Sequence, residues 1–219
     1  MIKSSTISFL KGLKKNNNKE WFDRHKEQYL EAKNNFAEFI DELITEITRF
    51  DKRYSSLTSK ECLFRIYRDV RFSKDKRPYK VNMGASINPG GKKATSPGYY
   101  LHIEPGGSFL AGGVWMPSSD DLKKIRQEID YNGKVFRKVL SSKDFLKFFG
   151  SLDESYKLKT TPKGYHKTHP DIELLRFNSF IVWHKFSDTQ VQKKAFVKDL
   201  AKGCKIMKPF LDFLSVAVS

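Results

Sequence analysis

Cysteine, long apolar runs and acidic residues are all scarce in this chain of 219 residues. Its two cysteines, Cys62 and Cys204, lie far apart and in no metal-binding or redox spacing, which predicts buried free thiols in a reducing compartment. No apolar run approaches the ~20 residues that cross a bilayer, and the run at residues 7–10 is too short for a signal peptide. We therefore expect a soluble cytoplasmic protein without a membrane partner.

Several motifs of catalytic sites are also missing. Gly91-Lys92 follows Ser86 at the position where a phosphate-binding loop requires glycine, and the Gly-x-Ser-x-Gly turn of serine hydrolases does not occur. Of the five histidines only His166 and His169 lie close together, and no cysteine or acidic residue stands at a zinc-site spacing from them. The sequence therefore predicts neither a metal site nor a cofactor.

The feature that is abundant is positive charge. Lysine and arginine number 41 against 25 acidic residues, which gives a net charge of +16. Such an excess attracts polyanions and raises their encounter rate. We expect a phosphate-bearing small molecule or a nucleic acid as the partner, while the sequence gives no indication of oligomeric state. The hydrophobic content of 39%, with 18 phenylalanines, is ample for a globular core.

Apolar spacing predicts helices at both ends of the chain. The first covers residues 4–15 and the second, longer one about residues 19–49, with a capping box from Asn17 to Glu20 and a kink near Asn34 and Asn35. Residues 118–219 read as helices with one late strand at 179–186. In the last part, Asp188 is expected to cap a helical pair that is interrupted around Gly203 and Pro209.

Alternating apolar residues predict strands in the middle of the chain, at residues 63–72, 81–88, 99–104 and 108–115. The fold class is therefore α+β: a central, mostly antiparallel sheet of about five to six strands, packed by the long N-terminal helix and the C-terminal helices. We expect a single domain over residues 1–219, with N-terminal helices at 4–50, a sheet core at 61–116, and helices with the late strand at 118–219.

The most unusual stretch is residues 63–81, which we call the basic segment. It holds seven cations and two acids interleaved with aromatic and aliphatic side chains, a pattern that indicates a folded site for an anion and not a solvated charge run. The candidate ligand-binding residues are Arg65, Tyr67, Arg68, Asp69, Arg71, Lys74, Asp75, Lys76, Arg77, Tyr79 and Lys80.

Strand parity divides the basic segment into two faces. Arg65, Asp69 and Arg71 would share one face with Tyr67, whereas Arg68 would share the other with four apolar residues, namely Phe64, Ile66, Val70 and Phe72. Because a buried charge is costly unless it is paired, Arg68 must meet an acid, a bulge or a cavity. Its candidate partners are Asp69, Asp75, Glu61 and Glu104.

Three interpretations of the basic segment stay open. In the first, the segment binds a phosphate-bearing or nucleic-acid ligand. In the second, its arginines clamp an anionic substrate while Asp69 or Asp75 acts as acid or base. In the third, its charges form a structural ion-pair network. A magnesium site built from Asp69, Asp75 and Glu104 is a weaker option. Four further aromatic residues could stack nucleic-acid bases or form cross-strand pairs. They are Tyr99, Tyr100, His102 and Trp115.

Four stretches of the sequence carry a family resemblance. They are SFLKGLKKNNNKEWFDRHKEQY, FRIYRDVRFSKDKRPYKVNMGA, PGYYLHIEPGGSFLAGGVWMP and LKTTPKGYHKTHP. Together they resemble the DUF2461 family of uncharacterised conserved proteins, from about residue 8 to residue 214. The resemblance implies one α+β domain. It implies no activity and no catalytic residue, because the family has no assigned function.

Overall fold

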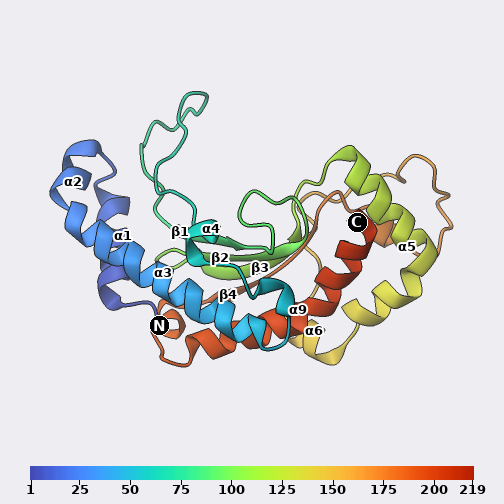
Figure 1. Ribbon diagram of the computed structural model, residues 1–219. Coiled ribbons are helices and arrows are strands. Elements are labelled where there is room, and N and C mark those ends of the chain that lie inside the picture. Colours follow the sequence, from blue (N-terminus) through green and yellow to red (C-terminus); the bar gives the residue numbers. More distant parts are fainter. The chain divides into compact units, whose positions relative to one another are not determined.

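The computed structural model describes all residues, 1–219 (Figure 1). Three helices open the chain: α1 (Ser4–Lys15), α2 (Lys19–Arg24) and α3 (Lys26–Thr48). The first was predicted with these bounds. The prediction of one helix over 19–49 is wrong, because His25 adopts φ −109° and ψ 24° and separates α2 from α3, while the chain stays helical through Asn34 and Asn35.

Two asparagines near the start of α2 differ from their predicted roles. Asn18, not Asn17, caps α2, and its side-chain oxygen accepts a hydrogen bond from the Trp21 amide. The Asn17 side chain instead pairs with the backbone of Tyr79: its amide donates to the Tyr79 carbonyl at 2.9 Å, and its oxygen accepts from the Tyr79 amide at 3.1 Å. This pairing fixes the end of α1 to the basic segment.

The sheet has four antiparallel strands in the order β1-β2-β3-β4. They are β1 (Met83–Ile87), β2 (Gly98–Ile103), β3 (Ser108–Val114) and β4 (Phe180–Phe186). The α+β class is confirmed, but the prediction of five to six strands is too high. Residues 63–72 form no strand and make only isolated bridges, Leu63 with Ala85 and Tyr67 with Tyr79.

The remaining helices largely follow the sequence pattern. They are the short 3₁₀ helix η1 (Lys52–Tyr54), α4 (Ser59–Cys62), α5 (Ser119–Leu140), α6 (Lys143–Phe149), α7 (Ile172–Leu175), α8 (Asp188–Val191) and α9 (Phe196–Val218). The expected interruption at Gly203 and Pro209 is wrong, because α9 continues through both residues. The cap of α8 is Ser187, not Asp188. No helix is long and apolar enough to cross a membrane.

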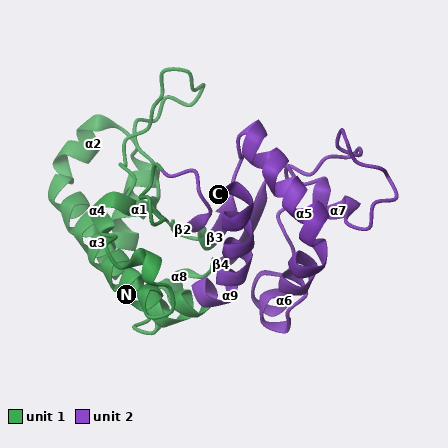
Figure 2. Cartoon of the chain, turned by 45° about the vertical axis from the view of Figure 1, so that its right-hand side comes forward, with its two compact units in different colours: residues 1–93, 100–110, 185–202 green, residues 94–99, 111–184, 203–219 purple.

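The chain forms two compact units, each made of three stretches of sequence (Figure 2). The first unit holds Met1–Lys93, Tyr100–Leu110 and Lys185–Lys202, and the second holds Ala94–Tyr99, Ala111–His184 and Gly203–Ser219. The predicted single domain over 1–219 stays a prediction. In the first unit, the apolar faces of α1 and α3 pack together, and Phe39 stacks on Phe196 with ring centroids 5.5 Å apart.

Phenylalanine rings form much of the core of the second unit. Phe136 on α5 stacks on Phe213 of α9 with centroids 4.3 Å apart, and Phe210 lies 5.9 Å from the same ring. Close packing also restricts β3: at Gly113 (φ +126°), an added Cβ would lie 1.9 Å from the Phe180 carbonyl oxygen. Both cysteines are free and buried, and burial raises the pKa of the Cys62 thiol to about 12.

A buried asparagine ties the N-terminus to α3. The Asn35 side chain is 6% exposed; its oxygen accepts from the Lys3 amide at 2.8 Å and the Thr6 hydroxyl at 2.9 Å, and its amide donates to the Met1 carbonyl at 3.2 Å. A buried donor or acceptor left without a partner costs about 1–3 kcal/mol. Asn35 is therefore a structural residue and not a helix breaker.

We predict that Asn35→Ala lowers the free energy of unfolding by about 2–3 kcal/mol, because it leaves the buried Thr6 hydroxyl and the partly buried Lys3 amide without their partner. Urea denaturation followed by circular dichroism measures the change. The matched control is Asn34→Ala at the neighbouring exposed position, where we expect a change below about 0.5 kcal/mol. Equal effects of the two substitutions would contradict this role for Asn35.

Candidate functional site

The basic segment projects from the first unit between α4 and β1 (Figures 1 and 2). Its two limbs are joined near the base by backbone hydrogen bonds, from the Lys80 amide to the Ile66 carbonyl at 2.8 Å and from the Arg68 amide to the Pro78 carbonyl at 2.9 Å. Tyr79 stacks on Phe22 of α2 with centroids 4.0 Å apart. The base of the segment is therefore anchored to the N-terminal helices.

Two aspartates order the arginines of the segment. Asp69 accepts from Arg71 through both oxygens, at 3.0 Å from Nε and 2.7 Å from Nη2. Asp75 accepts from Arg77 at 2.7 Å and also from Arg68 Nη1 at 2.8 Å. Arg68 thus meets an acid as its predicted position requires, and the partner is Asp75 on the opposite limb of the same segment.

These ion pairs hold both carboxyl groups in the ionised form. Hydrogen bonds from the Arg71 side chain lower the pKa of Asp69, and those from the Arg77 side chain lower the pKa of Asp75. A general acid or base works best when its pKa lies near the working pH. The arrangement therefore argues against acid–base catalysis by Asp69 or Asp75.

Four cations of the segment have no carboxylate partner. Lys76 donates to the Val70 carbonyl at 3.0 Å, and Lys80 lies over the Phe64 ring with its ammonium 5.4 Å from the centroid. Burial, and then the nearby charge of Arg65, lower the pKa of Lys80. Lys74 is exposed. Arg65, Lys74, Lys76 and Lys80 are therefore the cations left available to an external anion.

The predicted apolar face of residues 63–72 is only partly formed. Ile66 is 4% exposed, but Phe64 is 41% exposed and Phe72 is 97% exposed. Alternation buries a face only where a neighbouring strand or helix covers it, and this segment pairs mainly with its own return limb. Strand parity therefore placed Ile66 correctly and Phe72 incorrectly.

A second polar cluster lies on one face of β2 and was not predicted as a unit. His102 Nε2 lies 3.1 Å from a Glu104 oxygen, and the other oxygen of Glu104 accepts from Lys14 at 3.1 Å. Because an ionised carboxylate can only accept, Nε2 carries the proton and Nδ1 accepts from the Tyr100 hydroxyl at 3.2 Å. Asn82 lies 3.3 Å from the same nitrogen. We call this set of hydrogen-bonded side chains the β2 cluster.

Packing and backbone geometry orient the β2 cluster. His102 stacks on Phe109 with centroids 4.6 Å apart, and burial lowers its pKa although Glu104 acts in the opposite direction. At Gly84 an added Cβ would lie 2.7 Å from the Tyr100 hydroxyl oxygen, so glycine leaves room for the phenol. Tyr100, His102 and Glu104 stand at positions i, i+2 and i+4, a spacing that places side chains on one face of a strand and that could have indicated this cluster from the sequence.

The other predicted site residues are dispersed. Tyr99 is buried on the opposite face of β2 from Tyr100 and cannot stack a base, while Trp115 is exposed. Glu104 belongs to the β2 cluster and does not join Asp69 and Asp75. No group of three or more His, Cys, Asp or Glu side chains lies together as metal ligands would. The proposed magnesium arrangement is therefore not formed.

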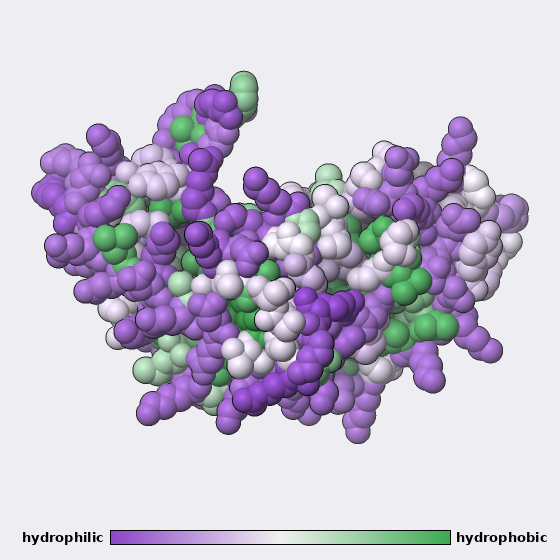
Figure 3. Space-filling view, viewed as in Figure 1, coloured by the Kyte–Doolittle hydropathy of each residue, from purple (hydrophilic) through white to green (hydrophobic).

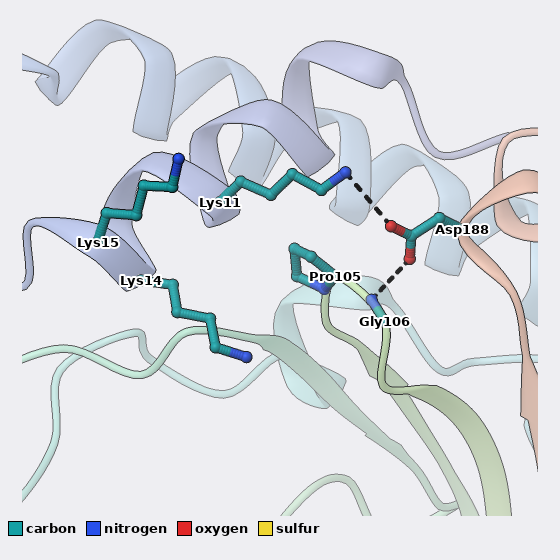
Figure 4. Close-up of a pocket in the computed structure, with 6 residues that line it drawn as sticks. All are labelled: Lys11, Lys14, Lys15, Pro105, Gly106 and Asp188. Atoms are coloured by element: carbon teal, nitrogen blue, oxygen red, sulfur yellow. Dashed lines mark hydrogen bonds and ion pairs between the residues drawn. The ribbon is translucent and has the colours of Figure 1, made fainter.

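A shallow pocket of about 390 Å³ adjoins the β2 cluster (Figure 4). Its lining residues are Lys11, Lys14, Lys15, Pro105, Gly106 and Asp188. Asp188 accepts from the Gly106 amide at 2.8 Å and lies 3.5 Å from the Lys11 ammonium. Since Glu104 holds Lys14, only Lys15 lacks an acidic partner in this pocket. Its cations are thus largely neutralised, unlike those of the basic segment.

We predict that Glu104→Gln lowers the pKa of His102 further, because the Glu104 charge favours the imidazolium form. Burial already lowers this pKa below 6.5, so the imidazole of the unsubstituted protein should be neutral at pH 7 and protonated on Nε2. A ¹H–¹⁵N NMR titration of the imidazole measures both. Glu31→Gln, at an exposed position of α3, is the control. An unchanged midpoint in Glu104→Gln would refute the coupling.

Comparison with known proteins agrees with the resemblance of the four sequence stretches. A family model described as a conserved hypothetical protein (DUF2461) matches residues 5–213. No curated protein matches the chain, and no solved structure matches it. The family description assigns no activity, so the chemistry of the site rests on the geometry above. The match spans nearly the whole sequence, and the chain belongs to the DUF2461 family.

Proposed function

We propose that the basic segment binds a ligand that carries several phosphate groups. The observation that carries the proposal is the excess of cations over carboxylates: seven against two within residues 63–81, a net charge of +5. Both carboxylates are already engaged by arginines of the same segment, and no acidic residue from elsewhere in the chain pairs with its cations. An excess of this kind is favourable for binding a polyanion.

The paired arginines support the same function. Arg71 donates to Asp69 from Nε and Nη2, so the N–H groups of Nη1 do not take part in this ion pair. Arg77 engages Asp75 through the same two nitrogens, and both arginine side chains remain more than half exposed. Guanidinium donors held in place by an acid lose less entropy when they bind phosphate. The ion pairs thus supply the order, and the remaining donors are available to the ligand.

An ion-pair network alone does not explain every cation of the segment. An ion-pair network accounts for Arg68, Arg71 and Arg77. It does not account for Lys74 and Lys76, which are exposed and bind no carboxylate. The enzyme alternative with Asp69 or Asp75 as acid or base is disfavoured by the low pKa of both groups.

The experiment is a salt series with a fluorescent twelve-nucleotide oligothymidylate, measured by anisotropy, with inorganic polyphosphate as competitor. Each phosphate contact adds about −0.7 to the slope of log K against log salt for a single strand. We expect Lys74→Ala/Lys76→Ala to make the slope shallower by about 1.4 and to weaken binding about tenfold or more at 50 mM salt.

The matched control is Lys163→Ala/Lys167→Ala, which removes two exposed lysines from a loop of the second unit. It should leave the slope and the affinity nearly unchanged. Binding that is absent at low salt, independent of salt, or equally sensitive to both double substitutions would overturn the proposal.

A further inference from the structure

The exposed ring of Phe72 is the feature of the basic segment that phosphate binding does not explain. Phe72 is 97% exposed, whereas burying a phenylalanine side chain stabilises a fold by about 1.5–3 kcal/mol. In the space-filling view the projecting segment is hydrophilic along most of its length and carries hydrophobic atoms at its tip (Figure 3). The Arg71 guanidinium lies 5.9 Å from the ring centroid, within the range of a cation–π contact.

Two further rings of the segment are partly exposed. Phe64 at its base is 41% exposed and has the Lys80 ammonium over its face, and Tyr67 is 42% exposed. Phe72 and Phe64 therefore each combine an accessible ring with an adjacent cation. Aromatic faces beside cations are the arrangement by which proteins hold single-stranded nucleic acid: the rings stack bases and the cations meet phosphates.

We infer that the ligand of the basic segment is single-stranded nucleic acid, with a base stacked on Phe72 and neighbouring phosphates on Lys74 and Lys76. This inference rests on the proposed function and narrows its ligand class. Seven residues lie between Phe64 and Phe72, so the Cα atoms that carry the two rings lie at most about 29 Å apart.

Other occupants fit the segment less well. A duplex offers few free base faces, because its bases are stacked on one another. A second copy of this chain also carries a net charge of +16, so it would be repelled by the segment. An anionic membrane would accept Phe72, but Arg71 lies beside that ring and would enter the apolar layer together with Asp69. A single strand leaves both charged groups in water.

The test compares a twelve-nucleotide oligothymidylate with an abasic oligonucleotide of the same length, which keeps the phosphates and lacks the bases. One stacked base contributes about 1–3 kcal/mol, so we expect about fivefold to 150-fold tighter binding of the oligothymidylate. Phe72→Ala should remove most of this difference and leave the affinity for the abasic strand unchanged. Phe72→Trp should keep or enlarge it. Thermal melts should be unaffected, because the side chain is exposed.

Tyr131→Ala, which removes a 72% exposed ring from α5, is the matched control and should keep the base preference. Equal affinity of the unsubstituted protein for both strands would overturn the inference while leaving the proposed function intact. Failure of both strands to bind at low salt would overturn the two together. A fluorescence change of Phe72→Trp with anionic phospholipid vesicles, and none with oligothymidylate, would overturn the inference in favour of a membrane.

Discussion

Repulsion among its own cations is the constraint that shapes the basic segment. Asp69 and Asp75 each bind the arginine two residues later, and Asp75 also reaches Arg68 on the opposite limb. The Arg68–Asp75 pair is therefore an electrostatic cross-link in a region that has few ladder hydrogen bonds. The same pairs lower the pKa of both carboxyl groups and so favour their ionised form.

Periodicity predicted the fold where each element buries its own apolar face. The bounds of α1 follow directly from the pattern. Residues 63–72 alternate as a strand would, but no neighbouring strand pairs with them along most of their length. The strand predicted there is therefore not formed. In α9 the helix continues through Pro209 because Met207 and Phe210 on either side are buried, and packing outweighs the local cost of proline.

The two polar sites were predictable to different degrees. The sequence offered Asp75 among four candidate partners for Arg68, although the strand register used to argue for such a partner is not formed. The β2 cluster depends on Lys14, which lies 90 residues from Glu104 and reaches it only through the packing of α1. Local spacing identifies Tyr100, His102 and Glu104 as neighbours on one face of β2, but it cannot reveal a partner brought in by the tertiary fold.

The division of the strands between the units has a consequence for synthesis. β2 passes from the second unit to the first at Tyr99–Tyr100, and β4 passes from one to the other at His184–Lys185. On the ribosome, the first unit therefore lacks its final stretch until Lys202 has been added. The anchors of the basic segment, from Phe22 to Gly84, emerge much earlier. During translation the segment can acquire its local contacts well before either unit is complete.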